Sequence, residues 1–350
     1  MSSQEKSHSL WHNLPFITSI VSVWQGWRAE QKAPRYQLAA MQDDSTELPY
    51  YPLDMRFLLT LPLGTLDEVG VPYNAPTGKY PSAYHPTTIA QYALAHWNIY
   101  LATGNEKHKQ AFLIQANWLV ANESRFADDR GGWPIPFALP EYFTSEPWLS
   151  AMTQGEGISV LVRAYRLTGE EIFLNVASRA IRTFELDIRY GGVCASIDGD
   201  GIFFEEVGAY PAAHILNGSL FALFGLYDYV ALTNDPRITE LIKRNLKTFH
   251  ALIDAFDNGY WSRYDLLYKR PATQFYHSLH VLQLKALVRY SGCEHCAALA
   301  ARWARYQQKF MCQLRYFIDS RVIRSGFISC WIARYRSGLS DNLSFILNRS

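Results

Sequence analysis

A short motif returns along this chain at an almost constant interval. Its copies read YLATGN, YRLTGE and YVALTND, and the steps from Thr103 to Thr168 and from Thr168 to Thr233 are both 65 residues. A shorter copy, Tyr290 to Gly292, follows about one step later. Each copy lies between two helix-length apolar segments, which is typical of stacked helical hairpins that cannot bury their apolar faces alone.

Two kinds of helix are expected to alternate between these motifs. The first member of each pair is the more apolar one, at 88–101, 157–167, 216–232 and 277–290. The second members carry Lys, Arg and Glu between apolar residues of helical period, at 107–123, 171–186, 237–256 and 294–314. We therefore predict an all-α fold, an incomplete (α/α) toroid of about four to five helical hairpins with a small N-terminal β element. Its inner ring of helices is buried and its outer ring is amphipathic.

The segments outside the repeats predict three regions. Residues 1–45 are expected to be a leader, because the apolar stretch 14–24 is too short to span a bilayer and lacks a small-residue cleavage site. An amphipathic helix near a membrane fits this stretch better than a secretion signal. Residues 46–86 are rich in aromatic residues and Pro and include the strand-like 56–61, which predicts an irregular segment with a β-hairpin. Residues 87–345 are expected to form the toroid domain.

The composition argues against one large class of partner. The chain has 33 Lys and Arg against 32 Asp and Glu, so no overall field attracts nucleic acid. A hydrophobic content of 49% with 15% aromatic residues suits a large buried core. We expect no nucleic-acid partner and no integral membrane span. A cytoplasmic or membrane-peripheral location is expected, with peripheral membrane contact and a homodimer left open.

The cysteines do not predict a metal site. The chain has five, an odd number without the spacing of a disulfide framework. Cys293 and Cys296 have the CxxC spacing of a zinc or redox half-site, but no second CxxC accompanies them. We therefore predict no metal and interpret the pair as ordinary thiols at the start of a helix.

Connections rich in Gly and aromatic residues follow three of the outer helices. They lie at 131–134, 191–193 and 259–261, which is the same phase of the repeat. They should gather at one mouth of the toroid, where Gly lets backbone approach a ligand and aromatic rings offer stacking faces. This mouth is the candidate site. The alternative is that these connections are only tight turns.

Two adjacent acids, Glu205 and Glu206, lie between apolar residues just before an inner helix. If the segment is extended, its neighbours point to opposite sides, so one acid can face solvent while the other faces the cavity. A partly desolvated Glu has a raised pKa and can act as a general acid or base near neutral pH. Capping of the following helix is the structural alternative. Several of the 22 tyrosines lie in loops that lead to inner helices, namely Tyr84, Tyr210, Tyr264, Tyr268 and Tyr276.

A series of motifs between about Gly70 and about Lys309 occurs in the order and with nearly the spacing of a known family. The motifs are IAQY (89–92) with His96, GGWPI (131–135), WLSAMTQG (148–155), VRAY (162–165), LNG (216–218), GLYD (225–228), YDL (264–266) and YH (276–277) with His280 and 283–284. Together they resemble the C-terminal α/α-toroid domain of the D-glucuronyl C5-epimerases of heparosan and heparan sulfate. The large β-sandwich of animal members is not found here, so a compact prokaryote-like member is expected.

The resemblance implies epimerisation at C5 of a hexuronic acid within a polysaccharide, from D-glucuronate toward L-iduronate. A base removes the C5 hydrogen on one face of the ring and an acid returns a proton to the other, without a redox cofactor. Residue by residue, the family's Glu falls on Glu206 and two of its tyrosines fall on Tyr264 and Tyr276. We expect Glu206 and Tyr276 to form the opposed pair and Tyr264 to hold or polarise the uronate.

Two departures from the family pattern affect substrate choice. Val207 stands where the family has a Tyr, which Tyr210 could replace, and Leu267 stands where it has an Arg, for which Arg263 or Lys269 could offer charge. The expected substrate-binding residues are Tyr84, Trp133, Gln154, Tyr210, Asn217, Arg263 and His277. Packing roles are the alternative for most of them.

Two other functions stay open at this point. The same C5 proton abstraction can end in β-elimination, which would make the protein a uronate polysaccharide lyase. A non-catalytic glycan-binding scaffold is the third possibility, and it is motivated by Val207 and Leu267. In each case the expected partner is a uronic-acid-containing polysaccharide.

Overall fold

The computed structural model describes residues 35–40, 49–61, 64–75, 81–126, 128–197 and 199–323, except for the side chains of 321–323. The chain divides into two compact units, of which Arg35–Lys309 is one. In the other, the described part is α10 (Phe310–Phe317) and a π-helical segment, Ile318–Ile323. The predicted leader helix at 14–24 lies outside the described residues, and the three predicted regions stay a prediction. None of the described helices combines the length and apolarity needed to cross a bilayer.

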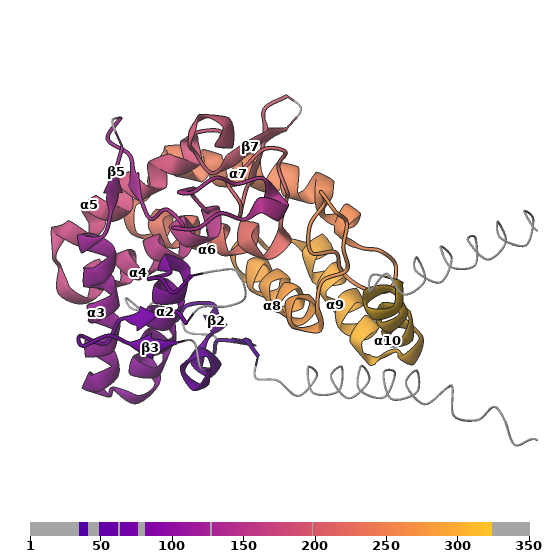
Figure 1. The fold of residues 1–350 in the computed structure, drawn as a ribbon, viewed down its shortest axis with the longest axis horizontal. Coiled ribbons are helices and arrows are strands. Elements are labelled where there is room, and N and C mark those ends of the chain that lie inside the picture. Colours follow the sequence, from indigo (N-terminus) through magenta and orange to yellow (C-terminus); the bar gives the residue numbers. More distant parts are fainter. Residues whose placement is uncertain are drawn as a thin grey trace, which may run out of the picture. The chain divides into compact units, whose positions relative to one another are not determined.

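The larger unit contains helical hairpins in sequence order (Figure 1). The pairs are α2 (Pro86–Thr103) with α3 (Glu106–Ala121), α4 (Ala151–Thr168) with α5 (Glu171–Ala180), α6 (Leu216–Thr233) with α7 (Pro236–Leu252), and α8 (Gln274–Ser291) with α9 (Glu294–Gln308). The first members pack on one another in the order α2, α4, α6 and α8, and each second member packs on its own partner. The predicted α/α toroid is confirmed, with four pairs among the described residues.

The repeated motif is the turn inside each hairpin. The residue after each inner helix has a left-handed backbone, with φ of 65° at Gly104, 74° at Gly169, 53° at Asn234 and 65° at Gly292. Just before it, the Thr103 hydroxyl accepts a hydrogen bond of 3.3 Å from the N–H of Asn105, and Thr168, Thr233 and Ser291 do the same for their own next-but-one residues. Gly and Asn tolerate this conformation best, which explains why one of them follows each inner helix.

The two central inner helices, α4 and α6, approach each other closely. A Cβ atom on Gly225 would lie 2.1 Å from the carbonyl oxygen of Gly155, so the backbones meet where both residues lack side chains. Farther along, Arg163 binds Asp228 through two hydrogen bonds of 2.6 and 3.1 Å. Both side chains are buried, which makes the pair a specific cross-link between the helices.

An N-terminal segment bridges the gap between the last inner helix and the first. Strand β1 (Gln37–Leu38) pairs antiparallel with β2 (Leu53–Asp54), and both contact α8. The following 3₁₀ helix η2 (Arg56–Thr60) packs on α2. The interpretation of 56–61 as strand-like is wrong, because the buried Met55 and Leu58 stand three residues apart, which is helical spacing.

Short hairpins join each of the first two outer helices to the next inner helix. They are β5 (Ser124–Arg125) with β6 (Gly131–Gly132), and β7 (Cys194–Ile197) with β8 (Gly201–Phe204). Figure 1 shows β5 and β7 at the same edge of the unit. A further two-residue pair, β3 (Thr65–Leu66) with β4 (Pro72–Tyr73), precedes α2. Glu205 and Glu206 follow β8 directly and lead into the loop before α6.

Candidate active site

A cavity of about 410 Å³ lies where the inner helices begin. Its wall includes Tyr36 from the N-terminal segment, Gln91 of α2, Met152 of α4, Asn217 of α6 and Tyr276 of α8. The volume falls within the range of about 300 to 1,000 Å³ that is usual for small-molecule sites. Because every inner helix contributes to the wall, the fold itself creates this hollow.

Glu206 is the carboxylate of the cavity wall. The Asn217 side-chain amide donates a hydrogen bond of 2.8 Å to Oε2, and the Tyr264 hydroxyl donates one of 3.4 Å to Oε1. The backbone N–H of Gly218 also donates to this carboxylate. Burial raises the pKa of Glu206 to about 7, although these three donors favour the charged form. The group therefore takes up and releases a proton near neutral pH.

Gly218 gives the Glu206 carboxylate its place over the first turn of α6. A Cβ atom on residue 218 would lie 2.4 Å from Oε2 of Glu206 and 2.3 Å from its Cβ. The helix has no side-chain cap of its own at Ile215. Glu206 thus both lines the cavity and binds the first turn of α6. The cavity position and the helix-capping role, which the sequence left as alternatives, are both present.

We expect Gly218→Ala to lower activity by about 10- to 100-fold, because the added methyl group pushes the Glu206 carboxylate out of its position. The measurement is the C5 hydrogen exchange of a uronate polymer that the family resemblance implies, with circular dichroism to show an unchanged fold. Ser219→Ala is the matched control in the same helical turn, since its buried hydroxyl has no hydrogen-bond partner among the residues that the structure describes. Equal activity of both variants would contradict this role for Gly218.

Glu205 points away from the cavity and is fully buried. Its carboxylate accepts a hydrogen bond of 2.9 Å from the backbone N–H of His214 and one of 2.5 Å from the ring Nδ1 of the same residue. The Glu205 carbonyl accepts from the N–H of Ala151 at 2.9 Å. The two acids do point to different sides, but the expectation that one faces solvent is wrong. The segment passes between the starts of α4 and α6, where both sides are enclosed.

Tyr264 and Tyr276 lie beside Glu206. Their ring centroids are 4.8 Å apart, and Tyr264 makes a hydrogen bond to Tyr276 as well as to the carboxylate. Burial raises the pKa of Tyr276 to about 12 and that of Tyr264 well above its usual value. Both phenols therefore carry their protons at neutral pH. The three residues expected to be catalytic form one connected cluster, in which Glu206 and Tyr276 line the cavity.

Trp133 and Gln154 do not line this cavity, and we correct their expected role. Both are buried, and the Gln154 amide binds the backbone N–H and carbonyl of Trp133, each at 3.2 Å. The Trp133 indole N–H donates to the carbonyl of Leu119 at 2.8 Å. Every polar group of the pair is used to join the 131–134 connection to α3 and α4.

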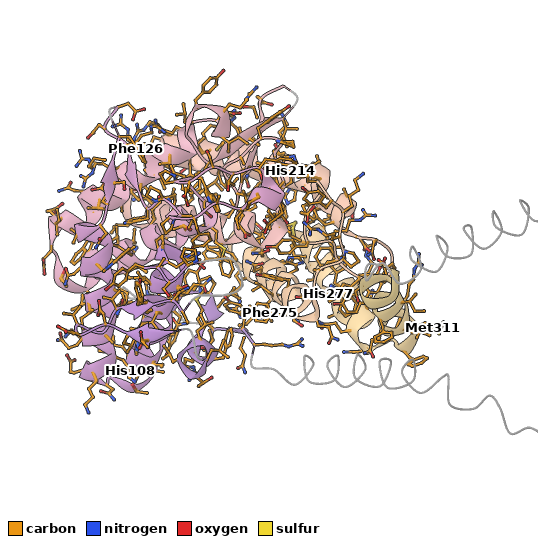
Figure 2. The ribbon with its side chains drawn as sticks, viewed as in Figure 1. His108, Phe126, His214, Phe275, His277 and Met311 are labelled. Carbon is orange, nitrogen blue, oxygen red and sulfur yellow. A yellow bond between two sulfur atoms is a disulfide. The ribbon has the colours of Figure 1, made fainter. Side chains whose placement is uncertain are left out.

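His277 is also a packing residue rather than a cavity residue. It lies on α8, as does Phe275, and both residues are labelled in Figure 2. Its Nδ1 accepts from the N–H of Ser262 at 3.0 Å, and its Nε2 donates to the carbonyl of Trp303 at 3.1 Å. Burial lowers its pKa to about 3, so the ring is neutral. Sequence alone does not reveal that both nitrogens are already occupied.

Of the four remaining residues that were expected to bind substrate, one lines the cavity and three do not. Asn217 lines it. Tyr84 donates to Asp67 at 2.9 Å, and Arg263 donates to the carbonyl of Ala255. Tyr210 is exposed and lines a separate hollow of about 400 Å³. These three side chains are not part of the cavity wall.

Three polar residues of the cavity region were missed by the sequence reasoning. The Tyr36 hydroxyl donates to Gln91 Oε1 at 3.4 Å, and Gln91 Nε2 donates to Glu156 Oε1 at 3.0 Å. Glu156 is fully buried, and this burial raises the pKa of its carboxyl group well above the usual value. Gln91 lies in the IAQY motif and could have been suspected. Tyr36 lies in the predicted leader, where no motif marks it.

Comparison with known proteins gives one matching family model. The model of the "D-glucuronyl C5-epimerase C-terminus" matches residues 127–305. A D-glucuronyl C5-epimerase of Caenorhabditis elegans is 33% identical over 223 residues, which are 57% of this chain and 35% of that protein. An uncharacterised protein of Methanocaldococcus jannaschii is 29% identical over 174 residues, which are 49% of this chain and 56% of that protein. The chain therefore covers less than two thirds of either relative.

Among solved structures, a cellobiose 2-epimerase from Bacillus thermoamylovorans superposes with a TM-score of 0.50. The alignment covers 72% of this chain and 67% of that chain, with 10% sequence identity. At this identity the likeness concerns the fold, which is the same arrangement of helical hairpins.

Proposed function

Because the chain belongs to the D-glucuronyl C5-epimerase family, whose C-terminal region it matches, we propose that it is a uronate epimerase. It inverts C5 of D-glucuronate residues in a polysaccharide. The observation that carries the proposal is the presence of Glu206, with a pKa of about 7, and the phenol of Tyr276 on the wall of one cavity.

Glu206 is the base of the proposed reaction. The C5 hydrogen lies α to the uronate carboxylate, so breaking the C–H bond sends its electron pair into that carboxylate as an enediolate. The proton goes to the ionised Glu206. A base with a pKa near the working pH combines a large ionised fraction with useful basicity, and such a group contributes about 10²- to 10⁴-fold in rate.

Tyr276 is the acid of the same reaction. Its hydroxyl proton passes to C5 on the other face, which inverts the centre. The resulting phenolate then takes a proton from solvent, and Glu206 releases to solvent the proton that it took from C5. Tyr264, which makes hydrogen bonds to both Glu206 and Tyr276, holds the two groups in place and favours the ionised carboxylate. No electron acceptor takes part, because substrate and product have the same oxidation state.

The finer proposal concerns the substrate, for which we favour a heparosan-like polymer. The family and the Caenorhabditis elegans relative support a D-glucuronate substrate. Neutral donors on the cavity wall, among them Asn74, Thr87 and Asn217, are suited to bind sugar hydroxyls and the uronate carboxylate.

Nuclear magnetic resonance of uronate polymers incubated with the protein in D₂O tests the proposal. We expect deuterium to enter at C5 and L-iduronate signals to grow. A rise in absorbance from unsaturated uronate ends would instead identify a lyase. Binding of the polymer without any exchange would identify a glycan-binding scaffold.

The rate should rise with pH around neutrality. Glu206 must be ionised to accept the C5 proton, so we expect kcat/KM to increase as pH passes through about 7 and then to level off. Tyr276 has a pKa of about 12 and keeps its proton over this range, so it adds no decline on the alkaline side. Exchange rates of a heparosan-like polymer at a series of pH values measure the profile. A rate that is flat or falls across neutral pH would contradict Glu206 as the base.

A further inference from the structure

The CxxC pair lies outside the cavity and has no role in the proposed reaction. Cys293 is the N-cap of α9, and its Sγ accepts a hydrogen bond of 3.0 Å from the N–H of Cys296 in the first turn. A disulfide joins the two sulfur atoms, so the interpretation of the pair as ordinary thiols is wrong. Both sulfurs are thus held at the N-terminal end of a helix, where the backbone dipole favours negative charge.

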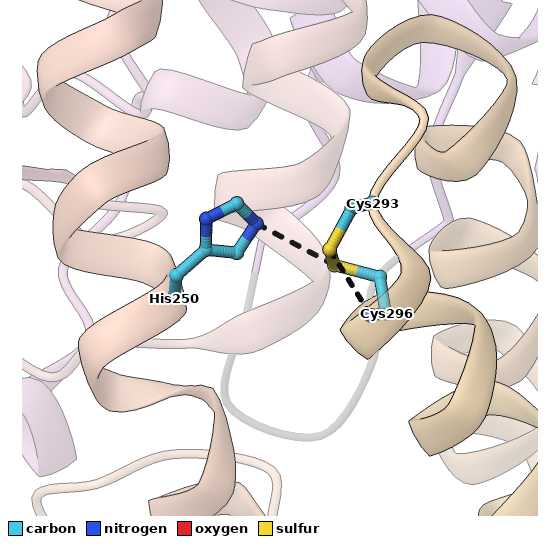
Figure 3. A group of neighbouring side chains, drawn as sticks. All are labelled: His250, Cys293 and Cys296. Carbon is cyan, nitrogen blue, oxygen red and sulfur yellow. Dashed lines mark hydrogen bonds between the residues drawn. A yellow bond between two sulfur atoms is a disulfide. The ribbon is translucent and has the colours of Figure 1, made fainter.

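The fold brings a histidine from another hairpin to this pair. His250 lies in the last turn of α7, and its Nε2 is 3.7 Å from the Sγ of Cys296 (Figure 3). The imidazole nitrogen and the two sulfurs all lie within 4.8 Å of one another. Among the described residues, this is the group of three His, Cys or acidic side chains close enough to hold one metal ion.

The donor set and its spacing suit zinc. Zinc bonds sulfur at about 2.3 Å and imidazole nitrogen at about 2.05 Å, so a tetrahedral ion places these donors about 3.5 Å apart. The distance of 3.7 Å between His250 Nε2 and Cys296 Sγ is close to that value. Two thiolates with one imidazole form a soft set that selects zinc over magnesium or calcium.

We propose that the reduced protein binds one zinc ion through Cys293, Cys296 and His250, and that this ion ties α9 to α7. The fourth position is open to solvent, because His250 is exposed and Cys293 is only half-buried. A dithiol first breaks the disulfide, giving two electrons and two protons to the cysteines and becoming a disulfide itself. Zinc then displaces the two thiol protons.

His295, which lies between Cys293 and Cys296 in the sequence, is not one of the proposed ligands. It lies 3.3 Å from Asp254, a residue that also contacts Arg302. This makes His295→Ala a matched control for His250→Ala, since both remove an exposed imidazole from the same region. Cys312, a free cysteine of the other compact unit, serves likewise as the control for the two cysteine variants.

The test measures metal content of the full chain, reduced, incubated with zinc and desalted. Elemental analysis should find about one zinc per chain in the wild type, in His295→Ala and in Cys312→Ser. His250→Ala, Cys293→Ser and Cys296→Ser should each retain less than about a tenth of that amount. Circular dichroism of each variant shows that the loss is not caused by unfolding.

Cobalt substitution of the reduced wild type gives a readout that needs no variant. Two thiolate ligands should produce a sulfur-to-cobalt charge-transfer band, together with the d–d bands of a tetrahedral ion. Absence of zinc from the reduced wild type would overturn the proposal. Zinc content that falls in His295→Ala but not in His250→Ala would also overturn it. Neither result depends on whether the protein epimerises uronate.

Discussion

Glu206→Gln is expected to lower C5 hydrogen exchange in D₂O by about 10²- to 10⁴-fold. The amide has nearly the size of the carboxylate and fits the same place over Gly218, but it cannot accept the C5 proton. Binding of the polymer, measured by titration calorimetry, should change little. Exchange at the wild-type rate would remove Glu206 from the role of base.

The stability of this variant provides its control. The pKa of Glu206 is about 7 in the folded protein and near 4.5 without the surrounding burial, so the folded state binds its proton more tightly. Protonation of Glu206 therefore stabilises the folded protein fully below about pH 4.5, and this stabilisation is lost as the pH rises through about 7. Gln carries no charge at any of these pH values. Glu206→Gln should thus melt at the same or a higher temperature than the wild type at alkaline pH, which separates lost chemistry from lost folding.

Tyr276→Phe is expected to lower the formation of L-iduronate by about 10²- to 10⁴-fold. The ring still packs against Tyr264 and Phe275, but the proton that is delivered to C5 is gone. Nuclear magnetic resonance of the polymer in D₂O again measures the effect, with calorimetry for binding. Deuterium that enters C5 without any iduronate would show that abstraction continues while delivery from the second face has stopped.

Tyr190→Phe is the matched control for this variant. Tyr190 is exposed, and its ring packs against the guanidinium of Arg189, away from the cavity wall. Loss of its hydroxyl should leave exchange at the wild-type rate. If Tyr276→Phe also forms L-iduronate at the wild-type rate, the acid of the reaction is another group.

The helical hairpins could be predicted because their signals are local. The left-handed cap at Gly104 and its counterparts depends on a few consecutive residues, and the period of the apolar residues reports which helix is buried. The cluster of Glu206, Tyr264 and Tyr276 was predicted from the order of the family motifs. Glu206 and Tyr264 stand 58 positions apart, so composition alone carries no sign of their contact.

The errors concern residues whose partners are fixed by tertiary packing. Trp133, Gln154 and His277 have side chains that suit a sugar site, but backbone groups of neighbouring segments occupy their polar atoms. Tyr36 was missed for the opposite reason, because it reaches the cavity across the gap between α8 and α2 from a segment without any repeat. The contact of His250 with the CxxC pair could not be predicted for the same reason, because the two lie 46 positions apart and meet only in the folded chain.

The N-terminal bridge between α8 and α2 supplies one side of the pocket from outside the helical repeats. The matched family region begins at residue 127, whereas Tyr36 and Gln91 of the cavity wall precede it. A change in the segment that carries Tyr36 can therefore reshape one side of the pocket while Glu206 and Tyr276 stay in place.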